Sequence, residues 1–276
     1  MIKIISSMFL AFAFCIGLVG CDKANNQSIT QDNQLIRVGT SPGPYSELFL
    51  QAIKPILEKQ GYTIKTIEFV NLRQADVALD YGDVDINVDQ HTAYYQDFNR
   101  NSGSDLIGIT KIPTVPAGLY TGKKTALNQV TSGDTVAIPL DPSNAARAYM
   151  LLQKAGWITL KNGIDPTKIS ARDVVENKYG INIIEMDSAT IPRALPDLEY
   201  AVITGSIVYA AKIDAKKALL REDILEPLIL VATVKQTNQN TPWAKAVVAA
   251  YHSAAFKQYM KEHNSDNYWF IPEELK

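Results

Sequence analysis

Short runs of the chain alternate between apolar and polar residues, whereas longer runs carry apolar residues at helical spacing. In the first half, this pattern predicts strands at 35–40, 63–70 and 84–88 and helices at 47–60 and 73–80. Gly61 and Gly82 lie just after the two helices, where glycine commonly ends a helix. A β-α-β-α-β order is typical of an α/β sheet with helices on its faces.

The second half shows the same kind of pattern without repeating the sequence. The predicted strands are 135–139, 181–186, 200–203 and 228–234, and the predicted helices are 141–155, a short turn at 191–195 and a long C-terminal helix at 243–262. Extended segments join the two α/β units. We therefore predict an α/β protein with two lobes and a ligand cleft between them.

The N-terminus has the layout of a secretory signal, with Lys3 at its start, an apolar run over 4–19 and the small Gly20 before a cysteine. Cys21 in this position resembles the lipobox cysteine of bacterial lipoproteins, whose thiol receives a diacylglyceryl group. The alternative is a transmembrane anchor, which requires about 20 apolar residues and thus a longer run. We interpret 1–20 as a lipoprotein signal peptide and Cys21 as the lipidation site.

The next segment is polar and rich in Asn and Gln, so residues 21–34 are predicted to be a flexible tether. Because Cys15 lies in the signal peptide, Cys21 is the only mature cysteine and no disulfide is expected. By resemblance to Gram-negative lipoproteins, Asp22 favours retention at the periplasmic face of the inner membrane. This holds if the organism has an outer membrane.

Charge and motif content exclude several function classes. Without Lys3 the mature chain has 26 basic and 29 acidic residues, a net charge of −3, whereas nucleic-acid binding usually requires a basic patch. The sequence has no G-x-S-x-G or H-E-x-x-H motif, and its three histidines are not clustered. We therefore expect no catalysis, no metal and no cofactor.

Polar residues follow the predicted strand at 84–88. A calcium loop beginning at Asp83 is excluded, because Val88 stands where such a loop requires glycine. Ligands of open α/β sheets bind beyond the carboxyl ends of strands, which favours four residues as site candidates: Asp89, Gln90, His91 and Tyr94. The alternative is a half-buried strand with solvated acids.

The helix predicted to start near Asp141 is suited to an anion. Asp141 is a favourable N-cap and Pro142 fits the first helical position, so free N–H groups point off the preceding turn. Three side chains share one helix face: Ser143, Asn144 and Arg147. A guanidinium beside an amide suits a carboxylate, although an ordinary capped helix with a solvated arginine is the alternative.

Several motifs together resemble the NlpA-type methionine-binding lipoproteins. They occur in the family's order and are G-D-V-D at 82–85, Q-H-x-x-Y at 90–94, D-P-S-N-x-x-R at 141–147, L-L-Q-K-A-G at 151–156, L-K-N-G at 160–163, D-V-V-E-N at 173–177 and I-P-R-A-L at 191–195. The resemblance implies a type II-like periplasmic-binding-protein fold. Its first lobe would comprise 35–117 with 226–276 returning to it, and its second 118–225, with hinges near 116–118 and Pro227.

The resemblance also implies roles for individual residues. Arg147 would bind the ligand's carboxylate and Asn144 the ligand's polar end, while His91 and Tyr94 would line the pocket. The expected partners are a small amino-acid-type ligand, an ABC permease and its ATPase subunit, and the protein is expected to be a monomer held at the membrane through Cys21. The alternative function is a surface interaction module, such as an adhesin, that has lost transport.

Three positions depart from the family pattern. Asp89 and Thr114 replace aromatic residues, and Thr204 replaces the ligand-binding asparagine. Because an unpaired carboxylate is costly to bury, Asp89 favours a ligand that is more polar than methionine, cationic or larger. The alternative is that Asp89 turns aside to pair with a nearby Lys or Arg while methionine is still bound.

Overall fold

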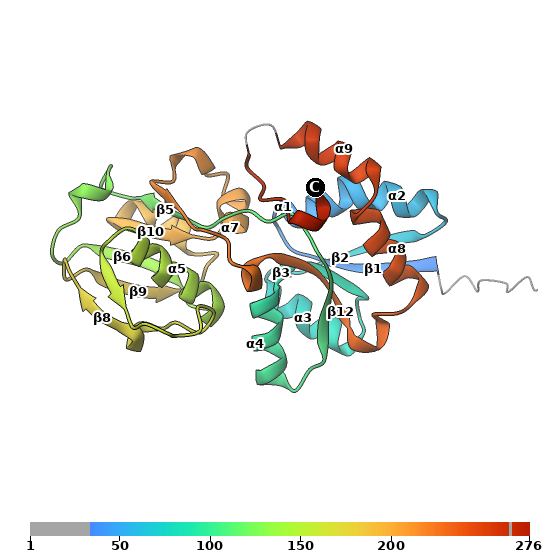
Figure 1. The fold of residues 1–276 in the computed structure, drawn as a ribbon, viewed down its shortest axis with the longest axis horizontal. Helices are drawn as coiled ribbons and strands as arrows, with labels where there is room; N and C mark the ends of the chain where they lie inside the picture. The colour runs from blue at the N-terminus through green and yellow to red at the C-terminus, as the bar shows by residue number, and fades with distance from the viewer. Residues whose placement is uncertain (1–33, 265–266) are drawn as a thin grey trace, which may run out of the picture.

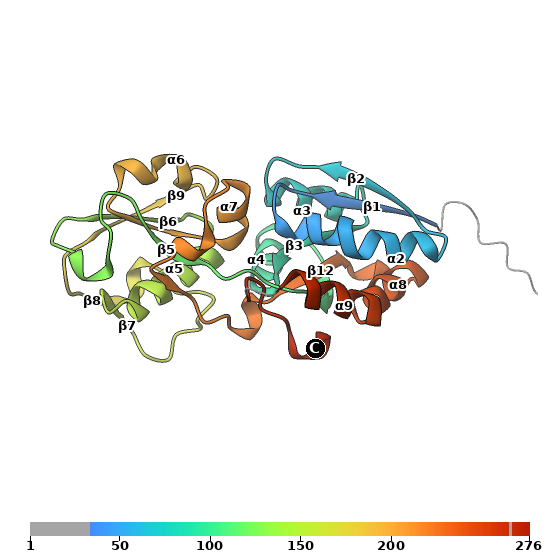
Figure 2. The same cartoon turned by 90° about the horizontal axis from the view of Figure 1, so that it is seen from above.

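The computed structural model describes residues 34–264 and 267–276. The predicted signal peptide, Cys21 and nearly all of the predicted tether lie outside the described residues. The ribbon forms two lobes side by side, one around each of two five-stranded sheets (Figures 1 and 2). Within the described part of the chain, no helix has the length and apolar character needed to span a bilayer.

Lobe 1 is formed by the first part of the described chain, through Lys111, and by its last part, from Leu230 onward. Its sheet has the order β2 (Thr63–Glu68), β1 (Leu35–Thr40), β3 (Ile86–His91), β12 (Leu230–Lys235) and β4 (Leu106–Lys111). β1 runs parallel to β2 and β3, whereas β12 runs antiparallel to β3 and β4. The chain therefore returns to lobe 1 after completing lobe 2.

Helices cover both faces of this sheet. They are α1 (Pro44–Leu48), α2 (Lys54–Lys59), α3 (Leu72–Tyr81), α4 (Thr92–Ser102), α8 (Pro242–Tyr251) and α9 (Ala254–His263). A π-helical turn, Phe49–Ile53, joins α1 to α2, just before Pro55, which has no backbone N–H to donate to the preceding turn. α1, α2, α8 and α9 enclose the larger core, while α3 and α4 pack on the opposite face.

The prediction of one C-terminal helix at 243–262 is wrong, because α8 and α9 are separate. The break falls at His252 and Ser253. The Ser253 hydroxyl accepts the backbone N–H of Phe256 at 3.1 Å, so Ser253 is the N-cap of a new helix. The apolar periodicity continues across the break and hides it in the sequence.

Lobe 2 is built around the second sheet. Its order is β11 (Leu220–Arg221), β5 (Gly118–Thr121), β10 (Tyr200–Ile203), β6 (Thr135–Pro139) and β9 (Asn182–Met186), with β10, β6 and β9 parallel and β5 antiparallel to both neighbours. α5 (Pro142–Lys154) packs on one face, and α6 (Ile191–Ala194) and α7 (Gly205–Ala210) lie on the other. A small antiparallel pair, β7 (Ile158–Leu160) and β8 (Val174–Asn177), extends the α5 side.

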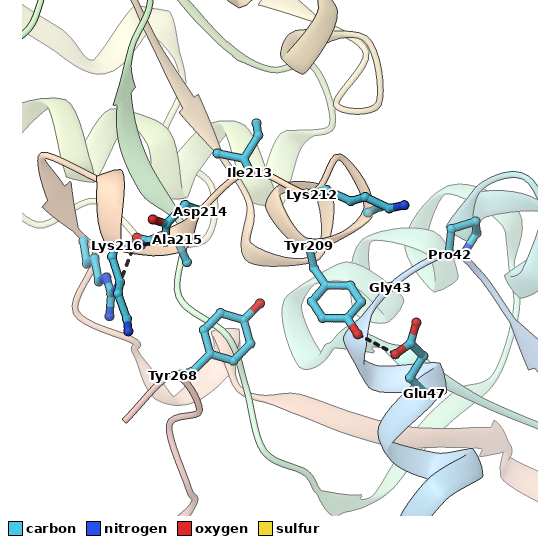
Figure 3. A pocket seen from close by; sticks show the side chains of 12 residues that line it. Pro42, Gly43, Glu47, Tyr209, Lys212, Ile213, Asp214, Ala215, Lys216 and Tyr268 are labelled. Atoms are coloured by element: carbon cyan, nitrogen blue, oxygen red, sulfur yellow. Dashed lines mark hydrogen bonds between the residues drawn. The ribbon is translucent and has the colours of Figure 1, made fainter. Parts of the chain in front are cut away.

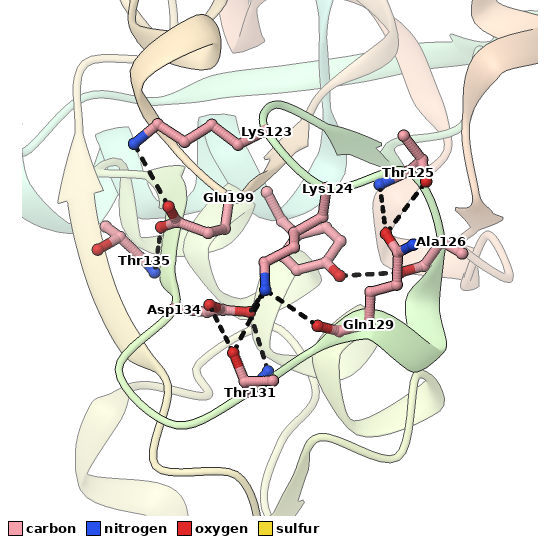
Figure 4. A network of polar contacts seen from close by, with 10 residues as sticks. Lys123, Lys124, Thr125, Ala126, Gln129, Thr131, Asp134, Thr135 and Glu199 are labelled. Atoms are coloured by element: carbon pink, nitrogen blue, oxygen red, sulfur yellow. Dashed lines mark hydrogen bonds and ion pairs between the residues drawn. The ribbon is translucent and has the colours of Figure 1, made fainter.

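A polar network fixes the connection between β5 and β6 (Figure 4). Asp134 accepts the backbone N–H and the hydroxyl of Thr131 at 2.9 and 3.0 Å, and Lys124 donates to the same hydroxyl at 3.3 Å. Glu199 accepts the backbone N–H of Thr135 at 2.8 Å. We interpret this network as structural, because it joins segments of lobe 2 to one another.

Two chain segments connect the lobes. The first crossover, residues 112–117, follows β4, and the second crossover, residues 222–229, follows β11. Thr114 anchors the first crossover, because its hydroxyl accepts the backbone N–H of Leu230 at 2.9 Å and its backbone pairs with Phe270. Tyr45 of α1 holds the next residue, since its hydroxyl accepts the backbone N–H of Val115 at 3.1 Å.

The predicted strand at 84–88 lies further along the chain than expected. β3 begins at Ile86 and continues through His91, so Asp89, Gln90 and His91 belong to the strand and do not follow it. The reason is β12, which pairs with β3 at Gln90 and His91 beyond the last contact of β3 with β1. This end of β3 faces the junction with lobe 2.

Asp76 on α3 gives a prediction about pH-dependent stability. Among residues 34–264 and 267–276, Asp76 Oδ2 and Gln90 Oε1 are buried without a hydrogen-bond partner, although Gln90 Nε2 donates to Asp76 Oδ1 at 2.6 Å. Burial raises the pKa of Asp76 to about 8, while the Gln90 hydrogen bond lowers it in part. A proton on Asp76 Oδ2 would turn one of these two unpartnered acceptors into a hydrogen-bond donor.

An unfolded Asp titrates at pH ~4, so the folded state holds the extra proton between about pH 4 and 8. The free energy of unfolding is therefore expected to fall as pH rises through this window. The Asp76→Asn variant should lose this pH dependence, because an amide stays neutral across the window. At pH 8 its free energy of unfolding should exceed that of the native protein by roughly 1–3 kcal/mol. Urea unfolding at pH 5 and pH 8 measures the two free energies of unfolding, with Asp83→Asn, at an exposed residue, as a matched control. A slope that persists in Asp76→Asn would contradict this assignment.

Candidate ligand-binding site

A cavity of about 700 Å³ lies between the lobes and has walls from both. Lobe 1 supplies the β1–α1 turn, the start of α3, Asp89 and the exposed side of α4; lobe 2 supplies the start of α5, residues 187–189 and the start of α7. The polar lining includes Ser41, Asn71, Arg73, Asp89, Tyr94, Asp97, Asp141, Ser143, Asn144, Asp187, Ser188 and Thr204. Apolar side chains also line it, among them Val70, Leu72, Phe98, Leu140 and Ile207.

The start of α5 forms the lobe 2 wall. Asp141 occupies the N-cap position as predicted, but its carboxylate does not cap the helix. It accepts the amide Nδ2 of Asn144 at 2.5 Å and the hydroxyl of Ser188 at 3.2 Å. Burial raises the pKa of Asp141, and these two hydrogen bonds lower it in part. Asp141 therefore orients Asn144 within the cavity.

Arg147 lies one turn further along α5 and is buried. Its Nη1 donates to Asn144 Oδ1 at 2.7 Å, which confirms that the two side chains share a helix face. Its Nε donates to Glu222 Oε2 at 2.9 Å, and its Nη2 is paired with Glu222 Oε1. Glu222 Oε1 also accepts the backbone N–H of Ala117 at 2.5 Å, so this carboxylate joins Arg147 to both crossovers.

His91 connects lobe 1 to the same amide. Its Nδ1 accepts the backbone N–H of Tyr94 at 3.1 Å, so the proton of the neutral ring lies on Nε2, which is 3.2 Å from Asn144 Oδ1. Burial and the nearby Arg147 charge lower the pKa of His91 to about 3, so the ring is neutral at physiological pH. Asn144 thus receives hydrogen bonds from both lobes through His91 and Arg147.

Tyr94 lies beside His91 at the start of α4. Its ring packs edge-on against the His91 ring, with centroids 6.1 Å apart, and it lines the cavity. Burial raises the pKa of Tyr94 above its ordinary value, so the phenol keeps its proton. It can therefore present both an aromatic surface and a hydroxyl to a ligand.

Asp89 lines the cavity but is tied to the start of α1. Its Oδ2 accepts the backbone N–H and the hydroxyl of Ser41 at 2.9 and 2.8 Å, and the hydroxyl of Ser46 at 2.8 Å. Burial raises the pKa of Asp89 to about 6, and the Ser46 and Ser41 hydrogen bonds lower it in part. The alternative that Asp89 pairs with a nearby Lys or Arg is wrong, because Ser41 and Ser46 supply its hydrogen-bond donors.

The remaining predicted residues occupy different places. Thr204 lines the cavity at the N-cap of α7. Gln90 is buried under α3 with Asp76, and Thr114 lies in the first crossover. The described residues that line the cavity do not include Gln90, Thr114, His91 or Arg147; the last two stand directly behind Asn144.

The sequence prediction missed three residues of this region. Glu222 is 75 residues from Arg147, and no local pattern connects the two. Arg73 lines the cavity from the start of α3, and Tyr45 lies between the cavity and the first crossover. The tyrosine could have been noticed as an aromatic residue beside the turn-rich segment 41–44, but its partner at Val115 could not.

A second cavity of about 820 Å³ adjoins the first and shares Pro42, Gly43 and Ala210 with it (Figure 3). The Tyr209 hydroxyl of α7 is hydrogen-bonded to Glu47 of α1 at its edge, which joins the two lobes. This second cavity contains none of the residues that the sequence predicted for the site. The lobes are thus in contact at α1 as well as between His91 and Asn144.

Two α/β lobes with a ligand-sized cavity between them form the fold of periplasmic-type substrate-binding proteins. Residues 36–272 match the family model for NlpA lipoprotein. The chain belongs to the NlpA lipoprotein family, and the resemblance drawn from its motifs is confirmed.

Members of the family are similar to this chain in sequence and in fold. The D-methionine-binding lipoprotein MetQ of Escherichia coli is 30% identical over 243 residues, which cover 86% of this chain and 87% of MetQ. The membrane lipoprotein TpN32 of Treponema pallidum is 28% identical over 251 residues, covering 91% and 90%. A nutrient-binding protein from Burkholderia cenocepacia, solved with methionine bound, is 33% identical, with a TM-score of 0.79 and coverage of 86% and 99%. These matches confirm the two-lobed α/β fold.

Proposed function

We propose that this protein is the lipid-anchored substrate-binding component of an ABC importer and that it captures methionine or a more polar amino-acid relative in the cleft. The observation that carries the proposal is the interlobe cavity, whose lining residue Asn144 is hydrogen-bonded to His91 of lobe 1 and to Arg147 of lobe 2 behind it. Its volume lies within the range of about 300–1,000 Å³ typical of small-ligand pockets. The methionine-bound relative supports the same ligand class.

The lining suits an amino acid with an apolar side chain. Asn144 lines the cavity, and Arg147 behind it retains N–H donors for a ligand carboxylate. Val70 of lobe 1 and Leu140 of lobe 2 line the cavity although they are 84% and 57% exposed. A ligand side chain between them would bury apolar surface from both lobes, which favours a closed arrangement.

Closure would use the two crossovers as hinges. Each connects one lobe to the other, and such segments absorb the backbone rotation of domain closure. The contacts between His91 and Asn144 and between Tyr209 and Glu47 would then report the closed state. The closed form would dock on a membrane permease served by a separate ATPase subunit. The predicted lipid on Cys21 would hold the protein at the membrane.

Thermal unfolding of the full chain in detergent, in the presence of each amino acid and of methionine-containing dipeptides, tests this function. A ligand at about 100 times its dissociation constant should stabilise the protein by about 2.7 kcal/mol. Stabilisation by a single compound would identify the ligand. If no amino acid or dipeptide raises the midpoint, the proposal of an amino-acid carrier fails.

Asp89 gives a pH-dependent prediction for the same site. If its carboxylate attracts the ligand's ammonium, affinity should fall as pH drops below about 6, where Asp89 becomes protonated. The Asp89→Asn variant keeps one acceptor oxygen for Ser41 and Ser46 but should bind weakly at pH 7.5 and lose this pH dependence. Titration calorimetry at pH 5 and 7.5 measures both effects. Unchanged affinity in Asp89→Asn would leave Asp89 as an anchor of the β1–α1 turn only.

A further inference from the structure

Arg147 is not a free cation in this structure, because Glu222 already neutralises it. The carboxylate takes the Nε and Nη2 donors, and each of the two side chains is only 5% exposed. The backbone N–H of Ala117 donates to the same carboxylate at 2.5 Å. Glu222 is therefore held by α5 and by the first crossover, although it belongs to the second crossover.

A ligand carboxylate would not displace Glu222. Separating a buried ion pair leaves an uncompensated buried charge, which is strongly unfavourable. It is also unnecessary, because a guanidinium has five N–H donors. Within residues 34–264 and 267–276, Glu222 uses two of them and Asn144 one, which leaves two for a ligand. The ligand would thus join Arg147 with Glu222 in place.

The neutral Arg147–Glu222 pair determines which ligand charge the site accepts. A zwitterion adds no net charge to the neutral Arg147–Glu222 pair, whereas a monoanion adds a second carboxylate that no cation balances. The cavity lining has the same bias. It contains Arg73 and four carboxylates, namely Asp89, Asp97, Asp141 and Asp187. An ammonium group would be attracted by this lining, and a lone carboxylate would be repelled.

We propose that Glu222 is a specificity-determining residue that makes the site select ligands carrying an ammonium group together with the carboxylate. Its carboxylate acts through Arg147 and does not need to touch the ligand. The proposal rests on the proposed function, since it assumes that a ligand carboxylate reaches Arg147. It adds the charge class of the ligand and the residue that determines it.

Two probes of matched shape test this inference in the full chain, purified in detergent. Methionine is the zwitterion, and 4-(methylthio)butanoate is the same molecule without the ammonium group. Titration calorimetry at pH 7.5 should show that the native protein binds methionine at least about 100-fold more tightly. In Glu222→Gln this ratio should fall by about tenfold or more, because Arg147 then carries a net charge.

The ratio is the decisive quantity, because any loss of Arg147 positioning weakens both probes alike. Glutamine keeps an acceptor for the Ala117 N–H. Asp223→Asn is the matched control, since this neighbouring acid pairs with Lys154 at the surface and should leave the ratio unchanged. An unchanged ratio in Glu222→Gln would overturn the inference while the proposed function stands.

Two further outcomes keep the test decisive if Glu222→Gln does not fold. If the native protein binds 4-(methylthio)butanoate as tightly as methionine, the inference is overturned without any variant. If the native protein binds neither probe, the methionine-type function fails, and the inference fails with it.

Discussion

Replacing Arg147 by methionine is expected to lower the free energy of unfolding by about 3–5 kcal/mol and to abolish ligand binding. The stability loss arises because the Glu222 side chain, which is 5% exposed, would lose its cationic partner and, among residues 34–264 and 267–276, would keep the Ala117 N–H as its one donor. Urea unfolding measures the first effect and calorimetric titration the second.

A double variant separates these two effects. Arg147→Met with Glu222→Gln removes both charges and keeps an acceptor for Ala117, so most of the lost stability should return. Ligand binding should stay absent, because no guanidinium is present. If the double variant regains binding as well as stability, Arg147 is a structural partner of Glu222 and not the ligand's carboxylate site.

The Gly205→Ala variant is expected to lose about 2–3 kcal/mol of stability through overpacking. A Cβ at this position, at the start of α7, would lie 2.6 Å from Val115 Cγ1, 2.8 Å from Val115 Cβ and 2.9 Å from the Pro116 carbonyl oxygen. Two of these atoms belong to a β-branched side chain and one to the backbone, so they cannot easily move aside. The strain would separate lobe 2 from the first crossover.

Gly43→Ala serves as the matched control for Gly205→Ala. Its added Cβ would meet Ser206 Cβ at 3.7 Å, an ordinary van der Waals contact, and its φ of 166° is extended backbone. Urea unfolding should show a loss below about 1 kcal/mol. Equal losses in the two variants would contradict the close approach of α7 to the first crossover.

Elements with strong local periodicity could be predicted from the sequence. The strands at 35–40, 135–139 and 200–203 match β1, β6 and β10 residue for residue. Other elements were missed or misplaced. α4 is rich in polar residues and has a weak apolar stripe, so it gave no helical signal. The insertion of β12 between β3 and β4 depends on long-range pairing, which no local pattern encodes.

The same distinction applies to the site. Asn144 and Arg147 were predicted together because a three-residue spacing on a helix brings side chains into contact. The contact of His91 with Asn144 spans 53 residues and was not predicted, although each of the two residues was predicted to belong to the site. The serine partners of Asp89 lie 43 and 48 residues away, so the prediction could identify a buried carboxylate but not what satisfies it. Glu222 could not be found for the same reason.

Titration calorimetry with methionine, comparing the native full chain with Arg147→Met/Glu222→Gln, tests the central claim most directly. For methionine, or for the amino acid that raises the native midpoint in thermal unfolding, the account predicts one ligand per native chain and no measurable binding to the double variant, whose stability should remain near native. Equal binding by the two proteins, or no binding of methionine or any other amino acid by the native chain, would contradict it.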